Sequence, residues 1–160
     1  MLTYYLFIHF HPLLPYSLPH LFSSIKNGRV VVILAGRFAG KKAVVVKSSE
    51  EGDNEKRFGH CVVAGIDRYP RKVTRAMKPA KIEKRCKIKP FVKTINFNHV
   101  MPTRYSVDFD FKKAVDESAA SRVDTRKAIK KIFEEKYKNQ TAKSEKKAAG
   151  VQYFFTKLRF

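Results

Sequence analysis

The stretch "GRVVVILAGRFAGKKAVVVK", residues 28–47, holds two apolar runs rich in β-branched residues, separated by a short segment with two glycines. Such runs are typical of buried strands, so we predict strands at 29–35 and 42–47. The connection between them, 36–41, is short enough to close a hairpin, and its glycines permit backbone conformations that other residues avoid. The stretch therefore predicts a β-hairpin at the start of a small, barrel-like β-domain.

The same stretch has some features of a nucleotide-binding P-loop, G-x-x-x-x-G-K-[ST] between a strand and a helix. Ala35, however, stands where the first glycine would be, and Lys42 replaces the magnesium-binding Ser or Thr. The β-branched residues that follow are a poor helix start. These departures argue against an NTPase. We expect the turn instead to present Arg37, Lys41 and Lys42 beside exposed backbone N–H groups, an arrangement that suits phosphate oxygens.

The whole chain is strongly basic. Its 160 residues include 34 Lys and Arg against 14 Asp and Glu, which gives a formal net charge of +20 and a pI near 10.1. A hydrophobic content of 44% argues against a disordered polyelectrolyte, and the length suits one modest domain with tails. A compact domain of this charge repels itself unless a polyanion shares its surface. Nucleic acid is the expected partner, ahead of an anionic membrane.

Basic charge is densest in residues 68–93, which contain eleven basic residues against one acid, Glu83. Their net charge of +10 is half of the total. Pro70, Pro79 and Pro90 predict an extended, irregular segment that can follow a phosphate backbone. Because so many like charges on a loop without a partner would repel one another, we interpret this basic loop as the main nucleic-acid contact.

Further strands are predicted at 58–66, 91–97 and 104–111. In the last of these, four apolar side chains at alternate positions face one way: Tyr105, Val107, Phe109 and Phe111. The polar segment 48–57 separates the hairpin from the first of them.

The apolar period then changes from two to three and four, which indicates an amphipathic helix over 121–138. Its apolar face carries Ile129, Ile132, Phe133 and Tyr137. Ser121 and Asp124 resemble a capping box at its start. We interpret 139–150 as a flexible basic linker and 151–160 as a basic-aromatic tail whose rings pack on the barrel or stack on RNA.

The first 25 residues contain no Lys, Arg, Asp or Glu. Pro12, Pro15 and Pro19 interrupt the apolar residues, which argues against both a secretory signal and a transmembrane helix. Three alternatives remain: a degenerate targeting segment, a disordered extension, or translated sequence that is absent from the mature protein. We favour the last two, so residues 1–24 are treated as an uncharged extension that is disordered or artefactual.

The sequence offers only weak evidence for a catalytic or metal-binding site. His60 and Cys61 are adjacent on a predicted strand, so their side chains point to opposite faces and cannot form a nucleophile–base pair. Asp108 and Asp110 share a face, but such a pair is most often the polar side of a half-buried strand. Cys61 and Cys86 fit no disulfide framework, which favours a reducing compartment. We expect no enzymatic activity, no metal and no cofactor.

The hairpin stretch resembles a KOW motif, which occurs in several ribosomal proteins and transcription elongation factors. Four further blocks, in order, are similar to the eukaryotic large-subunit ribosomal protein family L-twenty-seven-e (L27e): "VVAGIDRYPRKVT" (62–74), "NHVMPTRYSVD" (98–108), "FEEKY" (133–137) and "FFTKLRF" (154–160). The resemblance covers residues 25–160. The uncharged first segment has no counterpart, the linker 139–150 is longer than usual, and Tyr153 stands where Trp is common.

The resemblance implies an SH3-like β-barrel with a helical C-terminal extension and a structural role on ribosomal RNA in the cytosolic large subunit. The expected fold is thus mainly β with an α extension: barrel 25–111 with the basic loop 68–93, then helical extension and tail 112–160. Neighbouring large-subunit proteins are the expected further partners, assembly is expected in the nucleolus, and neither a membrane nor a small-molecule substrate is expected. The alternative is a KOW-type RNA-binding regulatory module of transcription or translation.

The candidate RNA-binding residues lie in the hairpin, the basic loop, one predicted strand and the tail. They are Arg37, Lys41, Lys42, Lys47, Arg68, Arg71, Lys72, Arg75, Lys84, Arg85, Arg104, Lys157 and Arg159.

Overall fold

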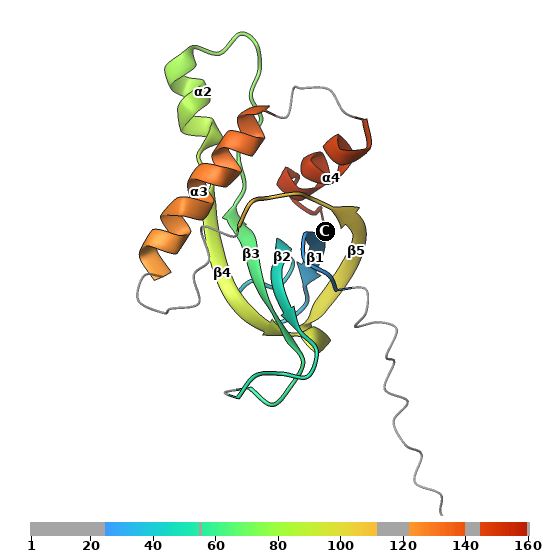
Figure 1. The fold of residues 1–160 in the computed structure, drawn as a ribbon. Coiled ribbons are helices and arrows are strands. Elements are labelled where there is room, and N and C mark those ends of the chain that lie inside the picture. The colour runs from blue at the N-terminus through green and yellow to red at the C-terminus, as the bar shows by residue number, and fades with distance from the viewer. Residues whose placement is uncertain (1–24, 55, 112–121, 140–144, 160) are drawn as a thin grey trace, which may run out of the picture.

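The computed structural model describes residues 25–54, 56–111, 122–139 and 145–159. In these residues a strongly curved antiparallel sheet is joined by three α-helices that gather over one part of it (Figure 1). The strands are β1 (Arg29–Ile33), β2 (Lys42–Ser49), β3 (His60–Arg68), β4 (Lys89–Asn96) and β5 (Val100–Ser106), in the spatial order β4-β3-β2-β1-β5. The helices are α2 (Pro79–Cys86), α3 (Arg122–Lys138) and α4 (Glu145–Phe155), and the 3₁₀ turn η1 is Phe97–His99.

The sheet is buried on both faces, so successive residues of one strand enter different cores. Val44 belongs to a helix core, whereas its neighbour Val45 belongs to a sheet core. The helix core contains Val30, Val44, Ala64, Ile66, Ile88, Val107, Phe111, Ile129, Phe133, Phe154 and Phe155. The sheet core contains Ile25, Val31, Ile33, Ala43, Val45, Cys61, Val63, Phe91, Ile95, Phe97 and Val100. This double burial explains why the hairpin strands are continuous apolar runs rather than alternating ones.

The expectation of a mainly β fold with an α extension is confirmed. Each strand of the described sheet is antiparallel to its neighbours, and η1 alone connects β4 to β5, the two edge strands. Within the described residues no ladder is assigned between these edges. The division into 25–111 and 112–160 remains a prediction, although α3 and α4 share the helix core with the sheet.

The predicted hairpin is confirmed. The backbone N–H of Gly40 donates to Ile33 O at 2.7 Å and that of Ile33 to Lys41 O at 3.0 Å. Gly36 and Gly40 have φ angles of 83° and 72°, in the left-handed region that favours glycine. The glycines therefore shape the turn, and β1 and β2 pair antiparallel beside it.

The amphipathic helix at 121–138 is confirmed as α3. Ile129 and Phe133 are fully buried in the helix core, and Ile132 and Tyr137 pack against it. The proposed capping residue Ser121 lies outside the described residues, as do the first segment 1–24, residues 140–144 of the predicted linker and Phe160.

The predicted strands β1 to β4 are shifted by at most two residues, and three segments differ more strongly from the sequence expectation. Residues 79–86 form α2 instead of irregular chain, because Pro79 occupies the first turn of the helix, where its missing N–H costs nothing. The last strand runs over Val100–Ser106 rather than 104–111, although Val107 and Phe111 are buried as expected. Residues 145–155 form α4 where a linker and tail were predicted.

Gly150, predicted to end the linker, lies inside α4. A Cβ atom at this position would lie 2.5 Å from the carbonyl oxygen of Ser106. The glycine therefore lets α4 approach β5 closely.

Candidate nucleic-acid interface

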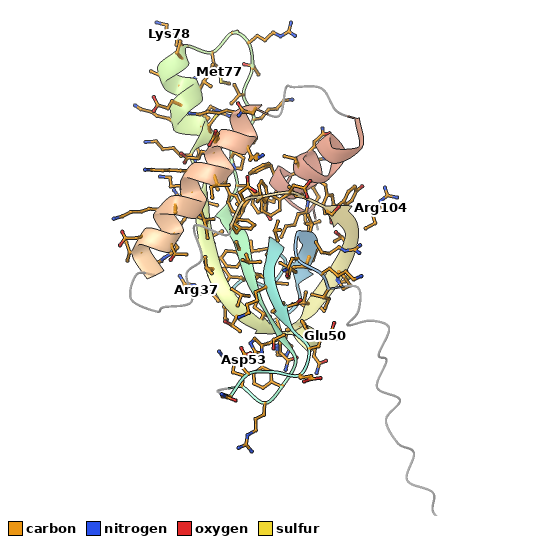
Figure 2. All side chains as sticks on the ribbon, in the orientation of Figure 1. Arg37, Glu50, Asp53, Met77, Lys78 and Arg104 are labelled. Carbon is orange, nitrogen blue, oxygen red and sulfur yellow. The ribbon has the colours of Figure 1, made fainter. Side chains whose placement is uncertain are left out.

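The cations of residues 68–93 are almost all at the surface. Ten of the eleven are exposed and Arg85 is half-buried. They are spread along the end of β3, the loop 69–78, α2 and the edge strand β4. Figure 2 shows Lys78 at one end of the molecule, beside α2. The helix holds the sole acid of the segment, Glu83, which is exposed.

The loop 69–78 is fastened to α2. The backbone N–H of Arg71 donates to Arg85 O at 2.9 Å, and the Nε of Arg85 donates to Lys72 O at 2.9 Å. The helix is followed by Ile88, whose backbone N–H donates to the carboxylate of Glu134 on α3 at 3.2 Å. The prediction of an extended, irregular segment is therefore wrong for residues 79–86, and the cations of the segment are carried by a folded unit docked on α3.

A second group of cations surrounds Asp67 at the end of β3. Lys89 Nζ lies 2.9 Å from the Asp67 carboxylate, and Lys41 Nζ donates to the Asp67 backbone carbonyl at 2.9 Å. The hydrogen bond from Lys89 lowers the pKa of Asp67, helped by the charges of Lys89, Lys41 and Arg37. Three cations around one carboxylate leave an excess of positive charge where the hairpin turn meets β4.

The hairpin turn is held in place by stacked aromatic rings. The ring of Phe38 lies parallel to that of Phe91 on β4, with centroids 3.9 Å apart and 3° between the planes. The guanidinium of Arg37 lies 5.7 Å from the Phe38 centroid. Arg37 is exposed and Lys41 is half-buried, so this turn presents cations on a fixed support.

The structure corrects the expected position of the Lys42 ammonium. Lys42 was expected to present its ammonium at the turn, but its side chain is 1% exposed. The ammonium donates to the carbonyls of Tyr153 and Thr156, both at 2.6 Å, and lies 3.6 Å from the Tyr153 ring centroid. Burial lowers the pKa of Lys42 to about 8, while the two carbonyls and the ring favour the charged form and oppose that shift. Lys42 therefore holds α4 and is not available to a phosphate in this structure.

Arg104 lies on β5, the opposite edge of the sheet from β4, and Figure 2 shows it far from Arg37. Its Nη2 donates to the Tyr105 hydroxyl at 3.0 Å, and this hydrogen bond raises the pKa of Arg104. The Tyr105 ring stacks on Tyr153 of α4 at 4.3 Å. Lys157, which follows α4, is exposed. These residues belong to a separate surface from the hairpin and α2.

Eleven of the thirteen predicted residues thus fall into three groups. Arg37 and Lys41 lie at the turn; Arg68, Arg71, Lys72, Arg75, Lys84 and Arg85 follow the end of β3 and α2; Arg104, Lys157 and Arg159 lie at or after β5 and α4. Lys47 is exposed on β2. The candidate residues omitted Lys89 and Lys93, two exposed cations four apart on β4. Alternation along a strand could have placed them together on one face.

The aromatic residues of the tail were predicted either to pack on the barrel or to stack on RNA. Phe154 and Phe155 are buried in the helix core, and Tyr153 is half-buried between Lys42 and Tyr105. The described rings of the tail therefore pack on the protein.

Acidic residues gather at the other end of the molecule. Glu50, Glu51 and Asp53 are exposed in the β2–β3 loop, and Figure 2 shows Glu50 and Asp53 at the end opposite Lys78. The Asp53 carboxylate lies 3.1 Å from Nε2 of the buried His60 ring. Exposed positive charge is therefore denser along α2 and β4 than at the end of the molecule that carries this loop.

Two kinds of functional feature are absent from the described part of the chain. No cluster of three or more potential metal ligands occurs in it, and none of its helices has the length and apolar character to cross a membrane. Cys61 and Cys86 are free, buried thiols. Burial raises the pKa of Cys61 to about 12, so this thiol is a poor nucleophile.

Comparison with known proteins gives consistent matches. Residues 30–160 match the ribosomal L27e protein family. The large ribosomal subunit protein eL27 of Tetrahymena thermophila is 51% identical over 141 residues, which cover 85% of this chain and 97% of that protein. Large ribosomal subunit protein eL27B of Saccharomyces cerevisiae is 46% identical, and eL27 of Candida albicans 47% identical, each with the same coverage.

Proposed function

The chain belongs to the ribosomal L27e protein family, and we propose that it is a structural constituent of the large ribosomal subunit that binds ribosomal RNA through its basic surface. The relatives named above are large ribosomal subunit proteins that match almost their whole length to this chain. The family consists of structural ribosomal proteins, and we assign this chain a role in binding ribosomal RNA, without catalysis.

The observation that carries this proposal is the density of exposed cations along α2 and β4. Ten exposed cations of residues 68–93 lie on or beside α2 and β4, while the acids Glu50, Glu51 and Asp53 lie at the far end. Phosphate contacts by Lys and Arg release condensed counterions and supply most of the sequence-independent affinity for a nucleic acid. A surface polarised in this way orients the protein on a polyanion.

The described structure also supplies the rigidity that such contacts need. Arg85 holds the loop 69–78 through Lys72 O, and the Phe38–Phe91 stack holds the hairpin turn. Cations fixed on a folded support lose less conformational entropy when they bind a phosphate than cations on a free chain. The helix α2 and the turn are therefore the parts of the surface that we assign to RNA. Arg104, Lys157 and Arg159 form a second contact, and neighbouring large-subunit proteins cover other surfaces.

The proposal places the protein in the cytosolic ribosome, with assembly of the subunit in the nucleolus. Sedimentation of cell extract through a sucrose gradient tests it. We expect the protein to sediment with large subunits, and to stay with them after a high-salt wash. A main pool in the light fractions would contradict the proposal and favour a free KOW-type regulatory module.

A further inference from the structure

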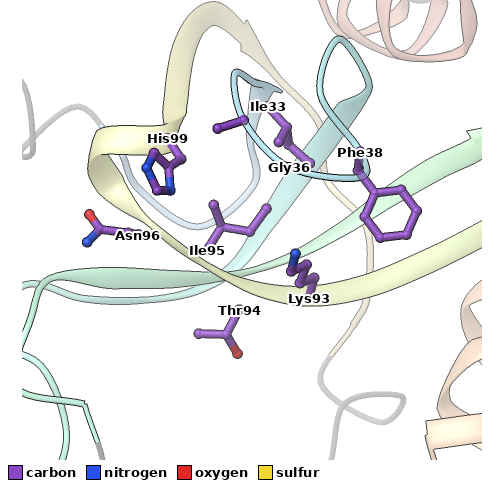
Figure 3. Close-up of a pocket in the computed structure, with 9 residues that line it drawn as sticks. Ile33, Gly36, Phe38, Lys93, Thr94, Ile95, Asn96 and His99 are labelled. Carbon is purple, nitrogen blue, oxygen red and sulfur yellow. The ribbon is translucent and has the colours of Figure 1, made fainter.

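A small pocket lies between the hairpin turn and the end of β4, where the chain enters η1 (Figure 3). Its volume is about 190 Å³. The residues that line it come from both sides, among them Ile33, Ala35, Lys93, Ile95, Asn96 and His99. A drug-sized ligand needs roughly 300 Å³ or more, so this pocket has room for a single small ring system.

The pocket combines an apolar floor with polar groups at its rim. In Figure 3, Lys93 and Ile95 point from β4 toward the turn, and Asn96 and His99 lie at the other end. Lys93 Nζ lies 3.9 Å from the position that a Cβ of Gly36 would take, so the ammonium reaches over the turn. The lining includes no acid.

The walls are held by the fold rather than by a ligand. The carbonyl of His99 accepts from the backbone N–H of Leu34 at 2.9 Å, which ties η1 to the turn. The Asn96 side chain accepts from the backbone N–H of Asn98 at 2.9 Å, so its amide NH₂ remains a potential donor. The ring of His99 is at the exposed rim. The pocket is therefore preformed, with donors and acceptors around an apolar floor.

We propose that this pocket receives one unpaired ribonucleotide, with its base against Ile33 and Ile95, its edge toward Asn96 and His99, and its phosphate on Lys93. The inference rests on the proposed function, since it assigns a specific contact within that RNA interface. Arg37 and Lys41, on the same turn, would hold the phosphates that flank the unpaired nucleotide.

Three observations favour this occupant. Sequence-specific recognition of RNA mostly targets unpaired bases, which leave the stack, lie against side chains and are hydrogen-bonded at their edges. An acid-free pocket with an ammonium at its rim suits a group that carries a phosphate, and it does not suit a basic side chain of a partner protein. The pocket also opens beside the cations of the hairpin turn, so an RNA backbone that binds these cations lies next to the opening of the pocket.

The test uses the full-length protein and short RNA duplexes labelled at one end. One duplex is fully paired, and four others carry a single unpaired nucleotide, each with a different base. Fluorescence anisotropy measures affinity at several salt concentrations. We expect at least one bulged RNA to bind about tenfold more tightly than the paired one at equal salt, near the lower end of what a buried base contributes.

The variant Ala35→Trp tests the pocket itself, because Ala35 is exposed, lines the pocket and carries no charge. The added ring should fill the pocket and abolish the preference for the bulged RNA, while the salt dependence of binding to the paired RNA stays unchanged. Ala39→Trp is the matched control: Ala39 is exposed in the same turn but does not line the pocket, so the preference should remain. His99→Ala should reduce the preference by severalfold.

The outcomes separate this inference from the proposed function. Equal, steeply salt-dependent binding of all five RNAs by the unmodified protein would overturn the pocket assignment and leave the general RNA-binding role intact. A preference that survives Ala35→Trp would overturn it as well. Weak binding without salt dependence would contradict the RNA-binding role itself, and the pocket assignment with it.

Discussion

The ammonium of Lys42, at the first residue of β2, lies 3.6 Å from the ring centroid of Tyr153 in α4. It also donates to the carbonyls of Tyr153 and Thr156, which lie at the C-terminal end of that helix. A cation is favourable there because the last carbonyls of a helix lack partners and the helix dipole is negative at this end. A residue next to the hairpin turn thus fixes the other end of the chain.

Replacing this ammonium should loosen α4. We expect Lys42→Met to lower the free energy of unfolding by about 2 kcal/mol, because the two carbonyls lose a charged donor while the apolar stem is retained. Urea unfolding followed by circular dichroism measures this. Limited proteolysis should show faster cleavage within 145–159. The exposed Lys131 on α3 provides the control: Lys131→Met should change stability by less than about 0.5 kcal/mol. Equal effects of the two variants would contradict the role of Lys42.

For Gly150→Ala, packing and helix propensity predict changes in stability of opposite sign. Propensity alone makes Gly150→Ala stabilising by about 1 kcal/mol. The structure places the new Cβ 2.5 Å from Ser106 O and 3.5 Å from a Val107 methyl, so we expect a loss of about 1–3 kcal/mol.

Ala149 is the exposed neighbour of Gly150 in α4, and Ala149→Gly should cost only the propensity difference of about 1 kcal/mol. Thermal or urea unfolding of both variants separates the two effects. A more stable Gly150→Ala protein would show that α4 does not approach β5 as described.

Tyr69 should make the protein sensitive to alkali. Its hydroxyl accepts from the backbone N–H of Lys42 at 2.9 Å, and burial raises the pKa of Tyr69 from 10.0 to about 12. Between these values the folded state keeps a proton that the unfolded state has lost. Stability from this group is therefore complete below pH 10 and is lost as the pH rises toward 12.

Unfolding free energies of the unmodified protein and Tyr69→Phe, measured from pH 9 to 12, test this. The curve of the unmodified protein should fall more steeply above pH 10, by up to about 1.4 kcal/mol per pH unit. Parallel curves would rule out the assigned burial of the hydroxyl.

RNA affinity should depend on salt through individual cations. Lys72 and Arg75 are exposed in the loop that α2 holds. With single-stranded RNA, the double variant Lys72→Ala/Arg75→Ala should reduce the slope of log affinity against log salt by about 0.7 for each lost phosphate contact. Arg57→Ala is the control, since Arg57 is exposed near the acidic β2–β3 loop and should leave the slope unchanged. If both changes reduced the slope equally, the binding charge would not be localised.

The local pattern of the sequence was sufficient for much of the fold. The apolar runs around Gly36 and Gly40 defined the hairpin, because two β-branched runs joined by a short connection with glycines favour antiparallel pairing of neighbouring strands. The spacing of Ile129 and Phe133 defined α3, because three- and four-residue intervals lie on one helical face. Where a local signal had two meanings, as with Pro79 and Gly150, the prediction was wrong: each was interpreted as breaking regular structure, and each lies within a helix.

By itself, then, the sequence determined the basic character of the protein, the hairpin, the long helix and, through its ordered blocks, the family. Tertiary structure alone decided which cations remain at the surface. Lys41 and Lys42 are adjacent lysines, yet one lies beside Asp67 and the other is buried under Tyr153. Charge and spacing along a chain cannot distinguish them, because burial depends on contacts with residues more than a hundred positions away. The pocket at the turn depends on the same kind of long-range contact, between β1 and β4.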